Sequence, residues 1–315
     1  MSTESPASES PLGVSILFVV KNEEKNLARI LPLIASQDYT GQVELIAVDS
    51  GSTDNTVALL KEHGALLREI PPQDFHHGRT RNLAASLASN EILVCLSGDA
   101  FPADAGWLRH LVAPFTDDRV GGVYGKQVAP EGTGTRRRQS LASEYSDVRQ
   151  VRDPARIEGY HPGYFRFSNA NAAIRRSCWE QFRWDETVLL AEDQGMCRDL
   201  LYSGRVVIYE PDAPVIHGHE RSLWGEFKFA LDSGASLSRL NILNNPDVGG
   251  EFRYGISRMV TDLAYFARRG RIDIVGISLI SFVMRYLGVQ LGKREARLPH
   301  WFMRYVSEVY GKMGH

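Results

Sequence analysis

Acidic and histidine side chains follow several predicted strands of this sequence at the point where each strand ends. They are Asp49, Asp99, Glu192, Asp193, His217 and His219. A single acid after a strand is an ordinary turn residue. Several polar side chains at the carboxyl edge of one α/β sheet are typical of a ligand site, because open sheets bind their ligands there. The pattern therefore predicts a binding or catalytic site at that edge.

Asp99 shows the two interpretations most clearly. The stretch EILVCL at 91–96 has the composition of a buried strand, and SGDA follows it directly. Gly98 and Asp99 are turn formers, so a simple turn explains them. A ligand-binding carboxylate at the carboxyl end of the strand explains them as well. This stretch alone does not decide between the two.

The elements that position these residues alternate between strand and helix in the first hundred residues. The run VSILFVV at 14–20 is apolar and β-branched, as in a parallel strand covered on both faces. Apolar residues then repeat with helical spacing at Leu27, Ile30, Leu31 and Ile34. Further strands are expected at 43–48, 66–70 and 91–96, and a helix near Thr80. This alternation predicts an α/β fold with a mostly parallel sheet.

The later part of the chain is expected to continue the sheet and then to become helical. We expect a strand at 120–128, a helix near 139–152, a strand in SNANAAIRR, a helix ending at Gly204, and a strand before His217. From about residue 222 the pattern is helical throughout. We therefore divide the chain into a disordered leader at 1–12, an α/β domain at 13–222 and a helical subdomain at 223–315.

The bulk composition excludes several classes of protein. The 315 residues carry a net charge of −2, which gives no overall preference for nucleic acid. The three cysteines lack the spacing of a zinc site or of a disulfide framework. KNEEKN follows the first strand in place of GxGxxG, and no P-loop follows any strand, so dinucleotide oxidoreductases and P-loop enzymes are disfavoured. The N-terminus lacks the basic start and apolar core of a signal peptide, which favours the cytoplasm.

Five motifs in order resemble a known family. They are VSILFVVKNEEKNL, VELIAVDSGSTDNT, GRTRNLAASLASNEILVCLSGDA, SNANAAIRR and AEDQGM. Together they resemble the family 2 glycosyltransferases, which have the GT-A fold, over residues 13–222. DFHHGRTRN and YLGVQLGKREARLP are similar to the bacterial rhamnosyltransferase-like branch.

The resemblance implies a metal site at Asp99. The family's strand ends in DxD, whose acids hold Mg²⁺ or Mn²⁺ on a sugar-nucleotide diphosphate; here the motif is Ser97-Gly98-Asp99, without the first acid. One carboxylate and a diphosphate can hold a hard cation, and the small Gly98 leaves space for the diphosphate. The resemblance favours His217 as a further metal or diphosphate ligand, and His219 is the other candidate. We expect only one of the two to face the site, and a structural histidine is an equal alternative.

The same resemblance implies a set of donor-binding residues. They are Asp49 and Ser50 near the nucleotide, Arg79 and Arg81 near the base and diphosphate, and Asn169 and Asn171 at the sugar or acceptor. The expected donor is a dTDP-, UDP- or GDP-linked sugar. Helix capping by Asp49 and Ser50, a solvated helix face for Arg79, and turn or strand-edge roles for the asparagines are the alternatives.

In the family, the second acid of a Glu-Asp pair is the general base. Carried over, Asp193 takes the proton of the acceptor hydroxyl, and Glu192 orients the acceptor or the base. Direct attack opposite the leaving group inverts the anomeric configuration. The alternative is that this pair merely caps a helix, since an acid at a helix start is stabilised there.

The C-terminal part is basic and aromatic. Residues 253–315 hold eleven Lys and Arg against four Asp and Glu. This composition suits contact with an anionic membrane surface, as a polyprenyl-linked glycan acceptor would require. A helical subdomain packed on the core and a homodimer interface are the alternatives. The longest apolar run, IVGISLISFVM at 274–284, lies between Asp273 and Arg285 and is expected to be too short to span a bilayer.

The sequence thus predicts a cytoplasmic, metal-dependent inverting glycosyltransferase, peripheral at the inner face of the plasma membrane. Its expected acceptor is a hydroxyl of a glycan or lipid-linked glycan, and L-rhamnose is the sugar favoured by the resemblance. The incomplete DxD leaves a non-catalytic sugar-nucleotide-binding or scaffold protein as an alternative. A retaining transferase of the same fold is another. A sugar nucleotidyltransferase is disfavoured, because KNEEKN supplies no Gly-rich loop with Arg and Lys.

Overall fold

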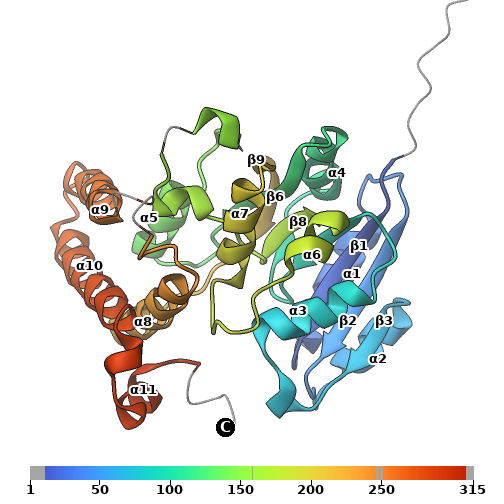
Figure 1. Ribbon diagram of the computed structural model, residues 1–315, viewed down its shortest axis with the longest axis horizontal. Helices are drawn as coiled ribbons and strands as arrows, with labels where there is room; N and C mark the ends of the chain where they lie inside the picture. Colours follow the sequence, from blue (N-terminus) through green and yellow to red (C-terminus); the bar gives the residue numbers. More distant parts are fainter. Residues whose placement is uncertain (1–10, 158, 246–247, 249–250, 310–315) are drawn as a thin grey trace, which may run out of the picture.

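The computed structural model describes residues 11–157, 159–245, 248 and 251–309. Residues 1–10 of the expected leader lie outside this range. The described chain forms one nine-stranded sheet with helices on both faces and a helical C-terminal region beside it (Figure 1). The strand order is β3-β2-β1-β4-β8-β6-β9-β5, and β7 pairs with β9.

The N-terminal half of the sheet is parallel. Its strands are β3 (Leu66–Glu69), β2 (Val43–Asp49), β1 (Val14–Val20) and β4 (Ile92–Leu96). Helices α1 (Glu24–Ala35), α2 (Thr56–Glu62) and α3 (His77–Ser86) connect them. The predicted apolar face of α1 is buried, as the helical spacing required. The strand–helix alternation read from the sequence is confirmed in this half.

The second half of the sheet is mixed in direction. Its strands are β5 (Phe101–Pro102), β6 (Val120–Val128), β7 (Gln150–Arg152), β8 (Asn171–Arg175) and β9 (Val206–Ile216). Strand β8 is antiparallel to both β4 and β6, and it pairs Asn171 with Leu96. The antiparallel entry of β8 brings its amino end to the carboxyl end of β4, beside Asp99. The mostly parallel arrangement expected from the sequence therefore holds for the strands up to β4.

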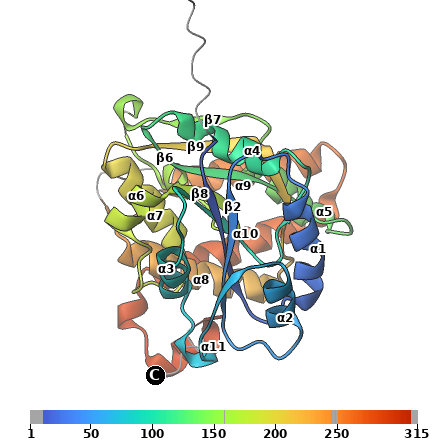
Figure 2. The ribbon, with the colours of Figure 1, turned by 90° about the vertical axis from the view of Figure 1, so that its right-hand side faces the viewer.

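Helices cover both faces of the sheet and enclose two apolar cores. Helices α3, α6 (Arg176–Phe182) and α7 (Glu192–Tyr202) lie on one face, and α1 and α4 (Trp107–Val112) lie on the other (Figure 2). The three cysteines are buried and free.

The helix expected near 139–152 is wrong in its bounds. Helix α5 spans Thr135–Glu144, and β7 follows as a short strand paired with β9. Arg152 is buried, and its guanidinium donates to the carbonyl oxygens of Tyr164 and Arg166. These contacts with distant residues fix an extended segment where local periodicity indicated a helix.

The C-terminal region is helical, as predicted. It consists of α8 (Leu223–Arg239), α9 (Glu251–Ala267), α10 (Ile272–Gly292) and α11 (His300–Val306). Glycines allow α8 and α10 to pack closely: a Cβ at Gly292 would lie 2.1 Å from the carbonyl oxygen of Leu231. These helices lie side by side at one end of the sheet (Figure 1).

Helix α10 corrects the expectation about membrane length. Its 21 residues make it long and apolar enough to cross a membrane by length and composition, and little of it is buried in the protein. Asp273 and Arg285, which bounded the apolar run in the sequence, both lie within the helix. A helix continues through an isolated charged residue because its backbone hydrogen bonds are unaffected, so the apolar element is longer than the uninterrupted run.

Candidate active site

Asp99, His217 and His219 form a cluster at the carboxyl edge of the sheet. Nε2 of His217 lies 3.5 Å from Oδ1 of Asp99, and Nε2 of His219 lies 3.1 Å from Oδ2. The three candidate ligand atoms lie within 4.8 Å of one another. Asp99 stands in a turn between β4 and β5. Asp99 is therefore both a turn residue and a member of the cluster.

Both histidines face Asp99, which corrects the expectation that only one would. Strand β9 ends at Ile216, so His217 and His219 belong to the segment after it. Residues i and i+2 of an extended segment lie on the same side. Their rings contact each other edge to face, with centroids 4.9 Å apart.

A hydrogen bond fixes which nitrogen of His217 faces the cluster. Nδ1 of His217 lies 2.9 Å from Oε1 of Gln127 on β6, and Nε2 of Gln127 donates to Oγ of Ser168. An amide oxygen only accepts, so the Nδ1–H of His217 donates to Gln127, and in a neutral ring Nε2 would have the lone pair that a cation needs. Partners of this kind orient the histidine ligands of metal sites. A carboxylate with two imidazole nitrogens fits a divalent cation.

The charge of Asp99 is well stabilised. Burial works to raise the pKa of Asp99, but the interactions with the His217 and His219 rings outweigh it and hold the pKa far below its usual value. Glu23 from the loop after β1 is close enough for the charge of Asp99 to contribute to raising the pKa of Glu23, although burial is the larger cause. Asp99 therefore stays ionised, as a ligand of a cation must be.

The Glu192-Asp193 pair begins helix α7. Ala191, directly before it, has φ 63° and ψ 20°, a left-handed conformation uncommon for a residue with a side chain. Strained backbone of this kind is concentrated at functional sites. Arg81 forms an ion pair with Oε1 of Glu192, which also accepts from Nδ2 of Asn169 at 3.2 Å. The backbone N–H of Asn169 donates to Asp193 Oδ2 at 3.3 Å.

The two acids of this pair have opposite pKa shifts. Burial, followed by repulsion from Glu192, raises the pKa of Asp193 to about 7. Burial also opposes the charge of Glu192, but the attraction of Arg81 and His77 prevails and lowers its pKa. A carboxyl group that titrates near neutrality beside one that stays ionised is a common arrangement in acid–base catalysis. The geometry favours Asp193 as the proton-transferring group and Glu192 as its positioning partner.

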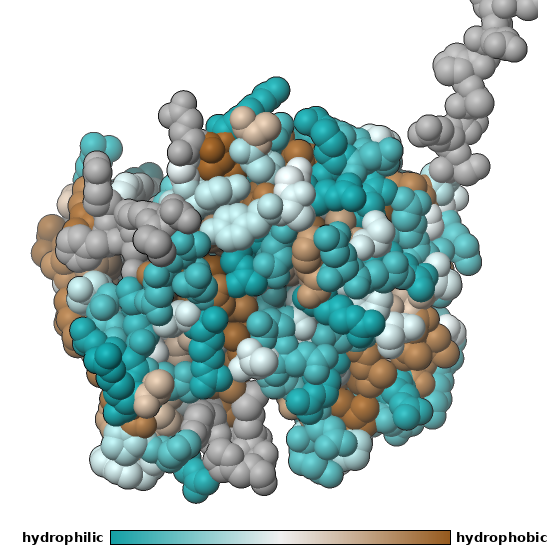
Figure 3. All heavy atoms as spheres, viewed as in Figure 1, coloured by the Kyte–Doolittle hydropathy of each residue, from teal (hydrophilic) through white to brown (hydrophobic). Residues whose placement is uncertain are grey.

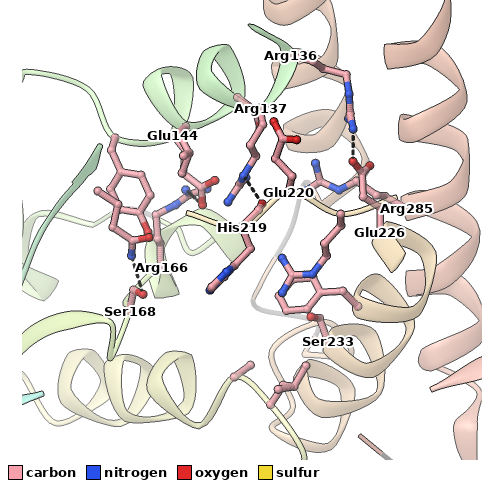
Figure 4. Close-up of a pocket in the computed structure, with 18 of the residues that line it drawn as sticks. Arg136, Arg137, Glu144, Arg166, Ser168, His219, Glu220, Glu226, Ser233 and Arg285 are labelled. Atoms are coloured by element: carbon pink, nitrogen blue, oxygen red, sulfur yellow. Dashed lines mark hydrogen bonds and ion pairs between the residues drawn. The ribbon is translucent and has the colours of Figure 1, made fainter. Parts of the chain in front are cut away.

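One cavity joins the two clusters. It has a volume of about 710 Å³, and both Asp193 and His219 line it. Helices α5, α8 and α10 form its other side; Figure 4 shows Arg137 of α5 hydrogen-bonded to His219 and Arg136 of α5 paired with Glu226 of α8. The cavity therefore connects the candidate metal cluster, the candidate base and the C-terminal helices.

Other predicted site residues lie at different places. Arg81 lines the cavity, whereas Arg79 is exposed and pairs with Glu186. Asp49 is buried, and its carboxylate accepts from the backbone N–H of Gly51 and Ser52 and from the Ser52 hydroxyl. The Asp49 side chain thus shapes the loop after β2.

Ser50, Gly98 and Asn171 are held by contacts within the sheet region. Oγ of Ser50 donates to the carbonyl oxygen of Val20. A Cβ at Gly98 would lie 3.0 Å from the Glu23 side chain, which occupies the space beside this glycine. Asn171 is fully buried: its Nδ2 donates to the carbonyls of Lys126 and Ala213, and its Oδ1 accepts from the Trp107 indole. Asn171 therefore joins neighbouring elements and does not line the cavity.

Several cavity residues were missed by the sequence analysis. Gln127, Arg136, Arg137 and Arg221 come from segments in which residue type alone indicated no chemistry. The RRR run at 136–138 is a basic stretch in the sequence, but the sequence does not show which of its side chains line the cavity. Glu23 was visible only as one acid of KNEEKN after the first strand.

Comparisons with known proteins agree with this geometry. The model of the family described as glycosyl transferase family 2 matches residues 15–181. O-antigen chain rhamnosyltransferase RfbN of Salmonella typhimurium is 30% identical over 267 residues, which is 84% of each chain. O-antigen chain rhamnosyltransferase WbaN of Salmonella anatum is 28% identical over 276 residues, 87% of each chain.

Solved structures share the fold. The mannosyltransferase PcManGT from Pyrobaculum calidifontis, in complex with GDP-Man and Mn²⁺, superposes with a TM-score of 0.62 at 17% identity, over 94% of this chain and 92% of that one. Residues 1–349 of S. aureus TarS in complex with UDP-GlcNAc give a TM-score of 0.55 at 13% identity, over 91% and 92% of the chains. The predicted GT-A architecture is thereby confirmed.

Proposed function

The chain belongs to glycosyl transferase family 2 and is a glycosyltransferase; from this premise we propose that it transfers a sugar with inversion from a nucleoside-diphosphate donor to a hydroxyl of a glycan. The observation that carries the proposal is the shared cavity, which is lined both by the candidate base Asp193 and by His219 of the candidate metal cluster. A base and a diphosphate-binding cluster must meet at one anomeric carbon for such a reaction.

The donor diphosphate belongs at the Asp99 cluster. Asp99, His217 and His219 would hold a divalent cation, which neutralises the negative charge that develops on the leaving diphosphate. Imidazole nitrogens are better ligands for Mn²⁺ than for Mg²⁺, which prefers oxygen. The two histidines therefore favour Mn²⁺ within the family's choice of metals.

Asp193 acts as the general base. Its carboxylate accepts the proton of the acceptor hydroxyl while the hydroxyl oxygen forms a bond to the anomeric carbon and the bond from that carbon to the diphosphate oxygen breaks. One displacement from the opposite face gives inversion. Arg81 and Asn169 hold Glu192, and the Asn169 backbone holds Asp193, so the pair is positioned before substrate binds.

Two relatives that cover most of the chain are named as rhamnosyltransferases, and this supports rhamnose as the transferred sugar. The donor would then be dTDP-rhamnose, with UDP- and GDP-linked sugars as the alternatives. Asp49 and Ser50 contribute to the donor site through the loop after β2, at the edge where the nucleotide is expected.

The acceptor is proposed to be presented at a membrane surface. Helix α10 exposes apolar side chains along its length, among them Ile277, Ile280 and Val283. Figure 3 shows apolar residues gathered along the edge where α9 and α10 lie. Arg271 precedes this helix and Lys293 follows it, and basic residues beside an apolar face are typical of proteins that lie on anionic lipid. A lipid-linked glycan and a peripheral location at the inner face of the plasma membrane fit this surface.

Calorimetry and product analysis test the proposal together. Purified protein is titrated with dTDP, UDP and GDP in the presence and absence of Mn²⁺. We expect one nucleotide to bind, and Mn²⁺ to strengthen its binding. The anomeric configuration of the product, measured by NMR, must be opposite to that of the donor. Absence of nucleotide binding under every condition, or retention of configuration, would contradict the proposal.

A further inference from the structure

Some of the arginines that line the cavity form ion pairs with carboxylates, and others do not. Arg136 is paired with Glu226 and Arg166 with Glu144, so these two guanidinium groups are neutralised locally. Arg137 and Arg221 line the same cavity. Among the residues that the structure describes, neither of them forms an ion pair with a carboxylate. The charges of Arg137 and Arg221 are therefore not neutralised by a direct ion pair as those of Arg136 and Arg166 are.

The contacts of the two side chains leave most of their donors unused. Nε of Arg137 donates to the carbonyl oxygen of His219 at 3.1 Å. The guanidinium of Arg221 lies over the ring of Phe229, 4.1 Å from its centroid. Each guanidinium group therefore keeps N–H donors for a ligand in the cavity.

We propose that Arg137 and Arg221 form a subsite for a phosphate or diphosphate group, separate from the Asp99 cluster. A guanidinium group presents paired donors that match phosphate oxygens. The carbonyl contact orients Arg137, and the stacking on Phe229 orients Arg221. The site is therefore built before its ligand arrives.

The group could belong to the donor or to the acceptor, and the walls of the cavity favour the acceptor. Beyond Arg221 the cavity is lined by Phe229, Ile274 and Ile277, and Phe229 and Ile277 are also exposed at the surface. An anion-binding subsite that continues into an exposed apolar wall suits a ligand with a phosphate head and an apolar chain. This assignment rests on the proposed function, since it identifies the acceptor as a lipid phosphate whose sugar hydroxyl reaches Asp193.

Binding measurements test the subsite without turnover. Farnesyl diphosphate is titrated by calorimetry into the protein already saturated with dTDP and Mn²⁺, and farnesol serves as the phosphate-free probe. The variants are R137Q and R221Q. The matched control is R138Q, because Arg138 is the neighbouring residue on α5, is exposed and lies outside the cavity lining. Thermal unfolding of each variant verifies that it is folded.

We expect farnesyl diphosphate affinity to fall roughly tenfold or more in R137Q and R221Q, as for loss of a hydrogen bond to a charged group. Farnesol binding, dTDP binding and all R138Q values should stay close to those of the wild type. If the two variants lose dTDP affinity instead, the pair binds the donor and the acceptor assignment is overturned. If the wild type does not bind farnesyl diphosphate, or the variants bind it equally well, the subsite itself is overturned. Failure of the proposed transfer reaction is read separately, from nucleotide binding and product formation by the wild type.

Discussion

Nδ1 of His217 lies 2.9 Å from Oε1 of Gln127, and this contact leaves Nε2 of the same ring facing Asp99. Gln127 stands on β6 and His217 follows β9, two strands that run parallel in the sheet. The pairing of these strands thus decides which atom of the histidine is available as a ligand. A residue without chemistry of its own acquires a positioning role through the sheet.

Replacing Gln127 with leucine removes the acceptor for the Nδ1 proton. We expect the Mn²⁺ affinity of the protein–dTDP complex to fall roughly tenfold or more, the usual effect of losing a partner of a metal-bound histidine. Competition calorimetry measures this affinity. Gln139→Leu is the control, because the partner of the Gln139 side chain among the described residues is Ser143 of the same helix. Unchanged Mn²⁺ affinity in Gln127→Leu would show that His217 needs no such partner.

Asp193→Asn removes the proposed base while keeping the size of the side chain. Turnover should fall by about a hundredfold or more, the usual contribution of general base catalysis. Affinity for dTDP should be retained, because the diphosphate is expected at the Asp99 cluster. Asp199→Asn is a control on the same helix, since Asp199 pairs with Arg198. Full turnover by a folded Asp193→Asn enzyme would remove Asp193 from the mechanism.

The pH dependence should follow Asp193. Its pKa of about 7 in the folded protein lies above the ordinary aspartate value of 3.8, so the folded state binds this proton more tightly than the unfolded chain does. The resulting stabilisation is complete below about pH 4 and is lost as the pH rises through about 7. Transfer activity should rise over the same upper range, because only the ionised carboxylate accepts a proton.

Denaturant unfolding of Asp193→Asn and of the wild type at several pH values tests this sign. The stability of the variant relative to the wild type should increase between pH 5 and pH 8, since asparagine does not ionise (the window follows from the pKa of about 7). A difference that stays constant with pH would contradict the raised pKa.

Ala191 should tolerate glycine and reject valine. Its φ of 63° suits glycine, whereas a β-branched side chain is strained there. Ala191→Gly should keep its activity and unfold within a few degrees of the wild type. Ala191→Val should lower both thermal stability and turnover, because it displaces the start of α7. Thermal unfolding and initial rates of the two variants provide the comparison; equal behaviour of both would show that the backbone strain is unimportant.

Asn171→Ala should destabilise the fold without changing donor recognition. The change leaves the Trp107 indole and two carbonyl oxygens without their buried partner. The free energy of unfolding should fall by about 2–3 kcal/mol or more, as expected for unsatisfied buried groups. Chemical denaturation measures the loss, and calorimetry with dTDP at low temperature measures affinity. A weakened dTDP affinity in the folded variant would restore Asn171 as a donor-binding residue.

The sequence by itself determined the parallel half of the sheet and the family. The continuous apolar run at 14–20 and the helical spacing of α1 report burial, and burial on both faces allows few other architectures. Once the parallel strands are predicted, the carboxyl edge of the sheet is known as well. The acids that follow the strands could therefore be assigned to that edge from the sequence. The Glu192-Asp193 pair needed only its motif.

The tertiary structure alone decided how these residues act. The run NAAIR in β8 is fully buried, and burial of every residue carries no information about strand direction. Only its pairing with β4 and β6 shows that β8 is antiparallel to them. The ion pair of Arg81 with Glu192, and the contact of Gln127 with His217, join residues that lie far apart in the chain. Local periodicity describes how much of a side chain is buried but not which distant group it meets. The direction of Arg137 into the cavity, like the bonds that make Asn171 structural, is therefore fixed by packing.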